Sequence, residues 1–431
     1  MMGEKIPDLG FEMHELCREL FPLCRSITGD GFRKSLAVLG RYLPNLKIFE
    51  VPTGTKCFDW KVPREWNISD AYIITPSGNK ICDFEESNLH VVGYSIPINR
   101  EILLEELQDH LYSLPDQPNA IPYVTSYYQE RWGFCITQHE RDQLEPGKYQ
   151  VFIDSELKNG SLTYGEVIIP GQSDEEIFLS TYLCHPSMAN NELSGPVVTT
   201  FLAKHLSGLT HRNYTYRFVF IPETIGSITY LSQNYKEMKE KVIAGFNVTC
   251  VGDERTYSYL PSRQGDTLSD RAALHTLKHL HPDFVRYSFL DRGSDERQYC
   301  SPGIDLPVCS IMRTKYGCYP EYHTSLDDLT LVTPAGLSGA YEVLKKSIQC
   351  LELDEVLQST VLCEPQLGKR GLYPTISTKG KDSRVKDMMN FLAYCDGSRS
   401  SLEIAEIIRL PLWEIIDTIE HLKNEDILRS C

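Results

Sequence analysis

A β-type segment that ends at a histidine, Ile177 to Cys184 followed by His185, constrains the fold of this chain more than any other feature. Charged residues precede the segment and a proline follows the histidine, so we expect a strand that stops there. A polar loop with Asn191 and Glu192 comes next, and an apolar helical run begins at Val197. In α/β proteins, loops at the carboxyl ends of strands carry functional side chains. The segment therefore predicts a site around His185, with a loop histidine that caps the next helix as the alternative.

β-type and helical segments alternate from about Gly147 to Leu351. Strands that are separated by helices pair mainly in parallel and are covered by helices on both faces. We therefore expect an α/β fold with a mixed, largely parallel sheet in this part of the chain.

Two other regions differ from this alternating pattern. Short β-type runs with Pro and Gly turns predict an inserted, mostly-β domain over residues 46–129. Three short amphipathic helices predict a winged-helix-like domain over residues 366–431. Residues 1–45 and 130–365 then form the α/β domain.

Composition narrows the classes of function. The chain has 431 residues and a formal net charge of -16, which argues against binding nucleic acid through its phosphates. Residues 381–431 hold 7 basic and 10 acidic side chains, so we expect this module to contact a protein or to have a structural role rather than to bind DNA. No apolar run approaches the ~20 residues that cross a bilayer, and no cysteines form a C-x-x-C pair. We expect a cytoplasmic protein without a membrane segment.

Polar side chains at four strand ends or loops should meet at one edge of the sheet. They are His185, Glu223 after the strand-like RFVFIP, Asp253 after FNVTCVG, and His323 in YHTSLDDL. Imidazole and carboxylate groups are zinc ligands, so their shared placement predicts a metal site. Each residue also has a structural alternative: a helix-start carboxylate for Glu223, an ion pair with Arg255 for Asp253, and a surface hydrogen bond for His323.

The order of the motifs resembles that of the zinc-dependent aminopeptidases of the co-catalytic exopeptidase clan. The motifs are GEVIIPG, EIFLSTYLCH, NNELSG, PETIGS, NVTCVGD, GSDERQY and YHTSLDDL. The whole chain is also similar to uncharacterised bacterial proteins with an aminopeptidase-like domain, an inserted β domain and a C-terminal winged helix, which are described in connection with polysaccharide biosynthesis. The resemblance implies a zinc-exopeptidase-like fold and zinc-dependent hydrolysis.

The chain departs from the pattern of this clan at ligand positions. Asn191 falls where the clan has its metal-bridging aspartate, although Glu192 beside it offers a carboxylate. Glu223 matches the first glutamate of the Glu-Glu pair, but Thr224 replaces the second. The resemblance therefore implies either Asn191 or Glu192 as a ligand.

The third aspartate of the clan is replaced as well. Thr249 stands in its place, and Asp253 would have to substitute from four residues later. His185, His323 and one carboxylate can still hold one zinc ion and leave a position for water. We expect one zinc ion rather than two, with Glu223 as the general base or as a ligand.

These observations predict a metal-dependent hydrolase of the aminopeptidase type. A zinc-activated water would cleave a peptide or amide bond in a small substrate. One alternative is a catalytically weakened protein that keeps the fold for binding or scaffolding. Another is a regulator that acts through the C-terminal module.

Overall fold

The computed structural model describes residues 9–370 and 383–431. The chain divides into two compact units. The first comprises Met1–Thr267 and Val285–Tyr341, and the second comprises Leu268–Phe284 and Glu342–Cys431.

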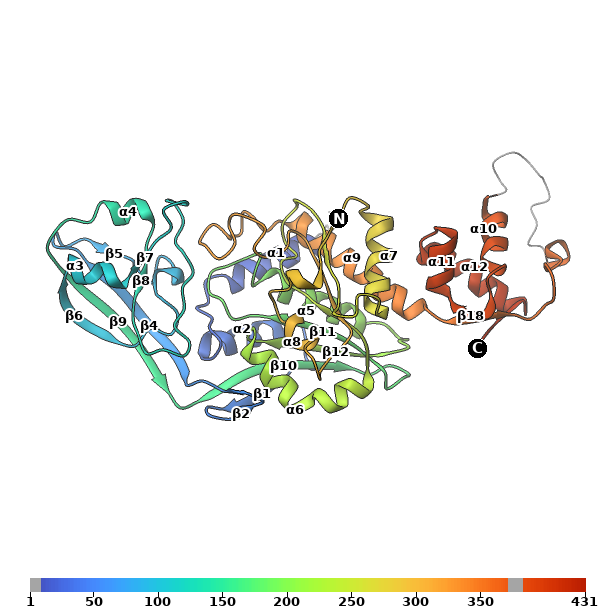
Figure 1. The fold of residues 1–431 in the computed structure, drawn as a ribbon, viewed down its shortest axis with the longest axis horizontal. Helices are drawn as coiled ribbons and strands as arrows, with labels where there is room; N and C mark the ends of the chain where they lie inside the picture. Colours follow the sequence, from blue (N-terminus) through green and yellow to red (C-terminus); the bar gives the residue numbers. More distant parts are fainter. Residues whose placement is uncertain (1–8, 371–382) are drawn as a thin grey trace, which may run out of the picture. The chain divides into compact units, whose positions relative to one another are not determined.

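The first unit is built on an eight-stranded sheet (Figure 1). Its strands, in order across the sheet, are β1 (Lys47–Pro52), β10 (Ser161–Ile169), β12 (Thr215–Ile221), β11 (Glu176–Tyr182), β13 (Val242–Asn247), β16 (Val308–Met312), β14 (Ser258–Leu260) and β15 (Val285–Arg286). The central neighbours β12, β11, β13 and β16 pair in parallel, whereas β1 and β10 add an antiparallel edge. This arrangement confirms the predicted mixed, largely parallel sheet.

Helices cover both faces of the sheet. They are α1 (Leu9–Leu20), α2 (Asp30–Gly40), α5 (Ser194–Ser207), α6 (Ile225–Lys241), α8 (Glu296–Tyr299) and the start of α9 (Pro334–Leu353). Neighbouring residues of β10 point to opposite faces: the hydroxyl of Tyr164 donates to Gln233 of α6 at 3.1 Å, while Gly165 lies against Leu36 of α2. Every residue of β11 is buried, as expected for a parallel strand between two helical layers.

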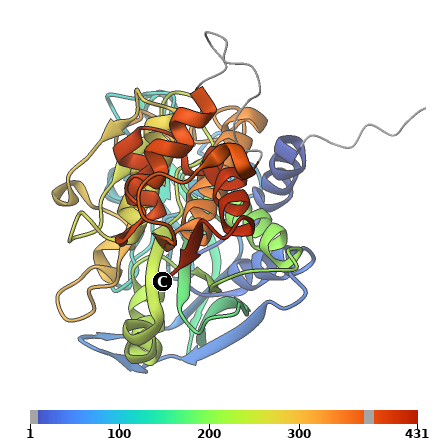
Figure 2. The same ribbon diagram turned by 90° about the vertical axis from the view of Figure 1, so that its right-hand side faces the viewer.

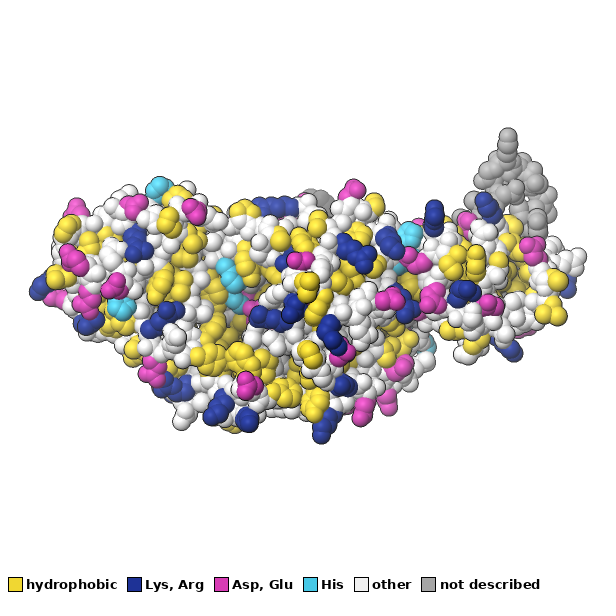
Figure 3. Space-filling view, viewed as in Figure 1, with side chains coloured by type: hydrophobic (Ala, Val, Ile, Leu, Met, Phe, Trp, Pro, Cys, Tyr) yellow, Lys and Arg dark blue, Asp and Glu magenta, His cyan; other side chains and the backbone are white. Residues whose placement is uncertain are grey.

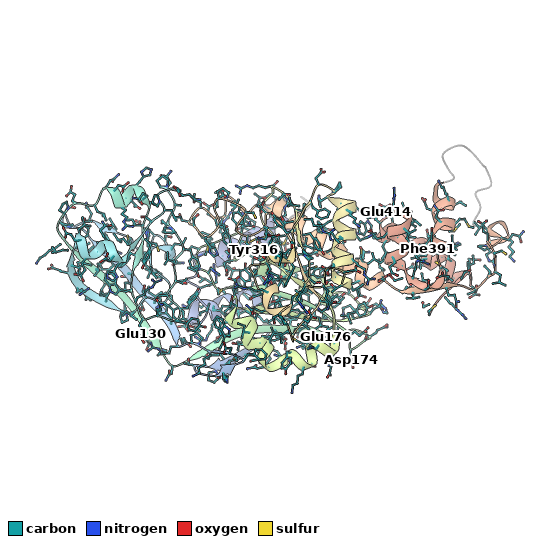
Figure 4. All side chains as sticks on the ribbon, in the orientation of Figure 1. Glu130, Asp174, Glu176, Tyr316, Phe391 and Glu414 are labelled. Carbon is teal, nitrogen blue, oxygen red and sulfur yellow. The ribbon has the colours of Figure 1, made fainter. Side chains whose placement is uncertain are left out.

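A buried charge network fixes the end of the sheet where β11 begins. The guanidinium of Arg217 donates to Glu176 at 2.6 and 2.8 Å and to Glu166 at 2.9 Å. Glu176 is labelled in Figure 4. Buried charges are tolerated only when they are paired, so these partners account for an arginine in the core of β12.

A second, antiparallel sheet of four strands forms a mostly-β region. Its order is β5 (Lys80–Ile81), β4 (Glu65–Ile74), β9 (Lys148–Lys158) and β6 (Ile98–Leu103). Two small strand pairs and two short helices accompany it, namely β2 (Lys56–Cys57) with β3 (Trp60–Lys61), β7 (Leu111–Tyr112) with β8 (Phe134–Cys135), α3 (Leu104–Leu107) and α4 (Gln138–Asp142). Ile73, Phe134 and Val151 are fully buried in its core.

Two strands pair outside the domain in which the predicted boundaries, residues 46 and 129, place them. β1 pairs with β10 in the large sheet, and β9 pairs with β4 and β6 in the small one. A β-type segment does not reveal which sheet it joins, because its partner lies far away in the sequence. The division of the chain into three domains stays a prediction.

The second unit contains a winged helix, as predicted. Helices α10 (Ser383–Leu392), α11 (Ser401–Ile408) and α12 (Leu412–Asn424) are red in Figure 2. They pack with a three-stranded sheet in the order β18 (Asp396–Ser400), β17 (Val356–Ser359) and β19 (Leu428–Ser430). Phe391, labelled in Figure 4, is fully buried in this module. β17 begins ten residues before the predicted boundary at residue 366.

Helix α7 (Leu268–Leu280) belongs to the same unit, although the sequence places it in the α/β domain. The backbone amide of Leu412 donates to Nε2 of His275 at 2.9 Å, and Nδ1 of His275 bonds Glu406 at 2.6 Å. Within residues 9–370 and 383–431, no helix combines the length and the apolar character that crossing a bilayer requires.

Candidate active site

His185 lies just beyond the carboxyl end of β11, where a buried carboxylate fixes its ring. Nδ1 of His185 contacts Glu192 directly. The other oxygen of Glu192 accepts the backbone amides of Cys184 and His185 at 2.6 and 2.8 Å. A carboxylate on Nδ1 sets the tautomer of a histidine. We therefore assign the proton of His185 to Nδ1, so that the unprotonated Nε2 faces the site.

Glu223 follows the neighbouring parallel strand β12 and faces this nitrogen. Its Oε2 lies 3.7 Å from Nε2 of His185. The next residue, Thr224, has φ 62° and ψ -76°, a conformation that costs a non-glycine residue energy and that clusters at functional sites. Burial raises the pKa of Glu223 to about 8, with the neighbouring His185 opposing and the carboxylates of Asp295 and Glu192 adding to the shift.

His323 presents a second imidazole to the same site. Its ring centroid lies 5.3 Å from that of His185, and its ring stacks on Tyr322 at 3.9 Å. Burial and the neighbouring His185 lower the pKa of His323 to about 3. Its Nε2 is buried and has no hydrogen-bond partner in the described part of the chain. A neutral imidazole with a free nitrogen is the form that binds a metal ion.

A loop between β7 and β8 closes the site from the side of the small sheet. The amide of Tyr123 donates to the carbonyl of His323 at 3.0 Å, and Pro122 forms a β-bridge with Thr324. The ring of Tyr123 lies 4.6 Å from that of His185 and 5.3 Å from that of His323. This loop therefore contributes an aromatic side chain to the site.

A cavity of about 180 Å³ opens at His185 and Glu223. Ile27, Trp60 and Tyr127 also line it. A larger groove of about 450 Å³ adjoins it at Trp60 and is lined mainly by hydrophobic side chains. Figure 3 shows histidine side chains in a hollow that hydrophobic side chains border. The site is thus accessible and suited to a small, partly apolar molecule.

Asn191 and Thr249 are tied to one tyrosine. The hydroxyl of Tyr182 bonds Thr249 Oγ1 at 2.7 Å and donates to Asn191 Oδ1 at a long 3.5 Å. Nδ2 of Asn191 donates to Glu192 at 3.1 Å. These three neutral side chains supply no negative charge where the aminopeptidase pattern has two carboxylates.

Asp253, which the sequence suggests as a ligand, is bonded to protein groups on both oxygens. It accepts the amide and hydroxyl of Thr314 at 2.9 and 2.7 Å, the amide of Arg255 at 2.9 Å and Nδ2 of Asn190 at 3.2 Å. These bonds join the loops that follow β13 and β16. As a ligand, Asp253 would have to give up some of them.

Two acidic residues support the site without having been singled out from the sequence as ligands. Asp327 accepts the amides of Asn190 and Asn191 at 2.6 and 3.0 Å, and burial raises its pKa to about 7. Asp295 accepts the amide of Thr224 at 2.8 Å, and burial raises its pKa to about 7 as well. The spacing of Asp327 after the Tyr-His-Thr motif was a usable signal for its role.

Arg25 also supports the site, but no feature of the sequence around it indicates this role. It is 1% exposed, and its Nε donates to the carbonyl of His185 at 3.2 Å. Burial lowers the pKa of Arg25, and the nearby carboxylate of Glu192 opposes that shift. The interaction spans 160 residues, so no local pattern announces it.

Two clusters of metal-binding residue types occur in the described part of the chain. One comprises Cys184, His185 and Glu192. Its atoms lie on the Nδ1 side of His185, where Glu192 already holds backbone amides, and burial keeps the pKa of the Cys184 thiol well above its usual range. The other comprises His275, His279 and Glu406, where both ring nitrogens of His275 are engaged. Neither cluster offers a free ligand set.

We expect Glu223 to make the metal-free protein less stable as the pH rises. Its pKa in the fold, about 8, exceeds its ordinary value of 4.5, so protonation favours the folded state. That contribution is complete below pH 4.5 and is lost as the pH approaches 8. In the chelator-treated protein, Glu223→Gln should reduce the loss of melting temperature between pH 5 and pH 8 by a few degrees.

Glu237→Gln is the control for this measurement. Lys241 lowers the pKa of Glu237, so its contribution to stability is lost at low pH instead. A Glu223→Gln protein that follows the wild-type curve would contradict the assignment.

Two family models match the chain. The model described as "Domain of unknown function (DUF4910)" matches residues 14–367, and the model described as "winged helix-turn-helix" matches residues 355–430. Together they cover both units of the structure.

A curated relative and a crystal structure from Clostridium acetobutylicum are similar over nearly the whole chain. The relative, "Putative polysaccharide biosynthesis protein with aminopeptidase-like domain", is 46% identical over 401 residues, which cover 92% of this chain and 91% of the relative. The crystal structure of a "putative peptidase" is 43% identical with a TM-score of 0.92, covering 98% of this chain and 96% of that chain.

More distant structures share the fold alone. A zinc aminopeptidase from Bacillus subtilis has a TM-score of 0.59 at 11% identity, covering 80% of this chain and 95% of that chain. A peptidase M28 precursor from Shewanella amazonensis has a TM-score of 0.56 at 12% identity, covering 83% of this chain and 97% of that chain. These likenesses confirm the expected aminopeptidase-like fold. The chain therefore belongs to the DUF4910 family, with an aminopeptidase-like fold and a C-terminal winged helix-turn-helix.

Proposed function

We propose that this protein is a metal-dependent hydrolase of the aminopeptidase type, which cleaves a peptide or amide bond in a small substrate. The observation that carries the proposal is the pairing of Nε2 of His185 with Glu223 at 3.7 Å beside the unpartnered Nε2 of His323. An imidazole pair with an adjacent carboxylate is suited to binding a metal ion and to taking a proton from water.

The residues present fit one zinc ion better than two. His185 and His323 each offer Nε2, and Asn191 offers the loosely held Oδ1. Thr224 and Thr249 replace the carboxylates that a second ion would need. When bound, zinc lowers the pKa of a water molecule and polarises a carbonyl group.

Glu223 is the general base in this proposal. Its carboxylate accepts no hydrogen bond in the described part of the chain, whereas Glu192 and Asp253 are engaged with backbone groups. A pKa near neutrality suits a group that takes a proton from water and returns it to the leaving amine. Glu192 keeps Nε2 of His185 directed at the same place.

The name of the curated relative indicates a context for the substrate. That relative is named for polysaccharide biosynthesis and for its aminopeptidase-like domain. We infer an amide-bearing small molecule of that metabolism as the substrate. The cavity and the adjoining groove at Trp60 have room for it.

A binding or scaffold protein that has lost turnover is the second candidate. It is favoured by one observation, the replacement of three clan carboxylates by Asn191, Thr224 and Thr249. It predicts no stoichiometric zinc and no effect of Glu223→Gln on ligand affinity.

Metal analysis of the purified protein tests the zinc site. We expect about one zinc ion per chain by mass spectrometry, because the site offers a single catalytic ligand set. His185→Ala and His323→Ala should each lose most of the metal. His279→Ala, in the other histidine cluster, should keep it. A zinc-free wild type, or both site variants with full zinc, would contradict the proposal.

Glu223→Gln tests the general base. On an aminoacyl or N-acyl amide substrate, kcat should fall by roughly 10²- to 10⁴-fold, the usual contribution of a positioned base. Zinc content should be retained, and the exposed Glu237→Gln should behave as wild type. If no amide is hydrolysed by the wild type, the scaffold candidate gains support.

We also propose that the winged helix contacts a protein rather than DNA. Helix α12 carries Glu414, Asp417 and Glu420 against Lys423, and the whole module is acidic. Such a surface repels phosphates.

Fluorescence anisotropy with the full-length chain and a duplex DNA fragment tests this proposal. At physiological salt we expect no binding tighter than the roughly 10⁻⁴ M of weak non-specific contacts. A tighter affinity that falls steeply with salt would identify a DNA-binding module instead.

A further inference from the structure

Two tyrosines of the loop between β7 and β8 place a hydroxyl pair over the site. The hydroxyls of Tyr123 and Tyr127 lie 2.6 Å apart and share a hydrogen bond. Tyr127 lines the cavity together with His185 and Glu223. The ring of Tyr123 packs 4.6 Å from that of His185. This pair therefore lies where a substrate would meet the proposed catalytic groups.

The pair has one more proton than its internal bond uses. Each phenol carries one hydrogen, and only one of the two is needed between the oxygens. No other partner of either hydroxyl occurs in the described residues. A phenol keeps its proton at neutral pH. One O–H is therefore free to donate to a bound molecule.

The surrounding contacts hold this donor in place. The loop is fixed beneath Tyr123 by the backbone bond to His323 and by the hydroxyl of Ser325, which accepts the amide of Ile121 at 2.9 Å. The ring of Tyr127 packs edge-on against Tyr94 at 5.2 Å. A donor that is already oriented need not reorganise during a reaction, which is what makes such groups effective.

We propose that the Tyr123–Tyr127 pair donates a hydrogen bond to the carbonyl oxygen of the substrate and stabilises the negative charge that develops on it. This inference rests on the proposed amide hydrolysis. Water adds to the carbonyl carbon, Glu223 takes the water proton, and the C=O electron pair moves onto the oxygen. The C–N bond then breaks, and the amine leaves with the proton from Glu223. The tyrosines keep their protons throughout.

Tyr72 of β4 provides a control in the same mostly-β region. Its ring packs 4.9 Å from that of Phe152 and beneath Lys80, and it is not among the residues that line the cavity. Removing its hydroxyl changes the same residue type without touching the Tyr123–Tyr127 bond or the site.

The test compares Tyr127→Phe, Tyr123→Phe and Tyr72→Phe in the full-length protein. The first readout is kcat on an amide substrate, which should fall at least about tenfold in the first two variants, because one oxyanion donor is worth that or more. The second is calorimetric binding of n-butylboronic acid, whose tetrahedral boronate resembles the hydrated amide. Its Kd should weaken about tenfold in the same two variants and not in Tyr72→Phe.

The outcomes separate this inference from the proposed function. If the wild type hydrolyses amides and both hydroxyl-pair variants match Tyr72→Phe, the pair is not the donor, although the hydrolase stands. The wild type could instead hydrolyse no amide and still bind the boronic acid, with a Kd that weakens in Tyr127→Phe. In that case the oxygen-binding pair stands without the hydrolase. A wild type that binds no boronic acid overturns the inference. The kcat of the double variant Tyr123→Phe/Tyr127→Phe should fall at least as far as that of either single variant.

Discussion

The carboxylate of Glu192 is the group on which the site depends, because it serves four buried donors at once. One oxygen ends β11 by accepting the amides of Cys184 and His185, and the other contacts Nδ1 of His185 and accepts from Nδ2 of Asn191. A buried carboxylate is costly unless its oxygens are bonded. The conformation of the strand end and the direction of Nε2 are therefore set by the same bonds.

Neighbouring acids are used in a similar way. Asp327 holds the backbone of the loop that carries Asn191, and Asp253 joins two strand-end loops through Thr314. These carboxylates stabilise backbone conformations that lie outside helices and strands. Glu223 alone among these four acids keeps a carboxylate without a hydrogen-bond donor in the described residues, which is why we propose it as the general base.

The mostly-β region contributes side chains to the site. The loop between β7 and β8 places Tyr123 against both histidines, and the β2–β3 pair places Trp60 between the cavity and the groove. Part of the wall around His185 and Glu223 thus comes from the mostly-β region rather than from the large sheet.

The sequence by itself determined the largely parallel sheet and brought His185, Glu223 and His323 together. Hydrophobic periodicity locates buried strands, and parallel strands end at one edge. The sequence also showed that the neutral Asn191 stands where the aminopeptidase pattern has a carboxylate. Only the tertiary structure decided that Glu192 orients His185, that Asp253 bonds to loops, and which sheet each edge strand joins. Such contacts form between segments far apart in the chain, and no local pattern encodes their geometry.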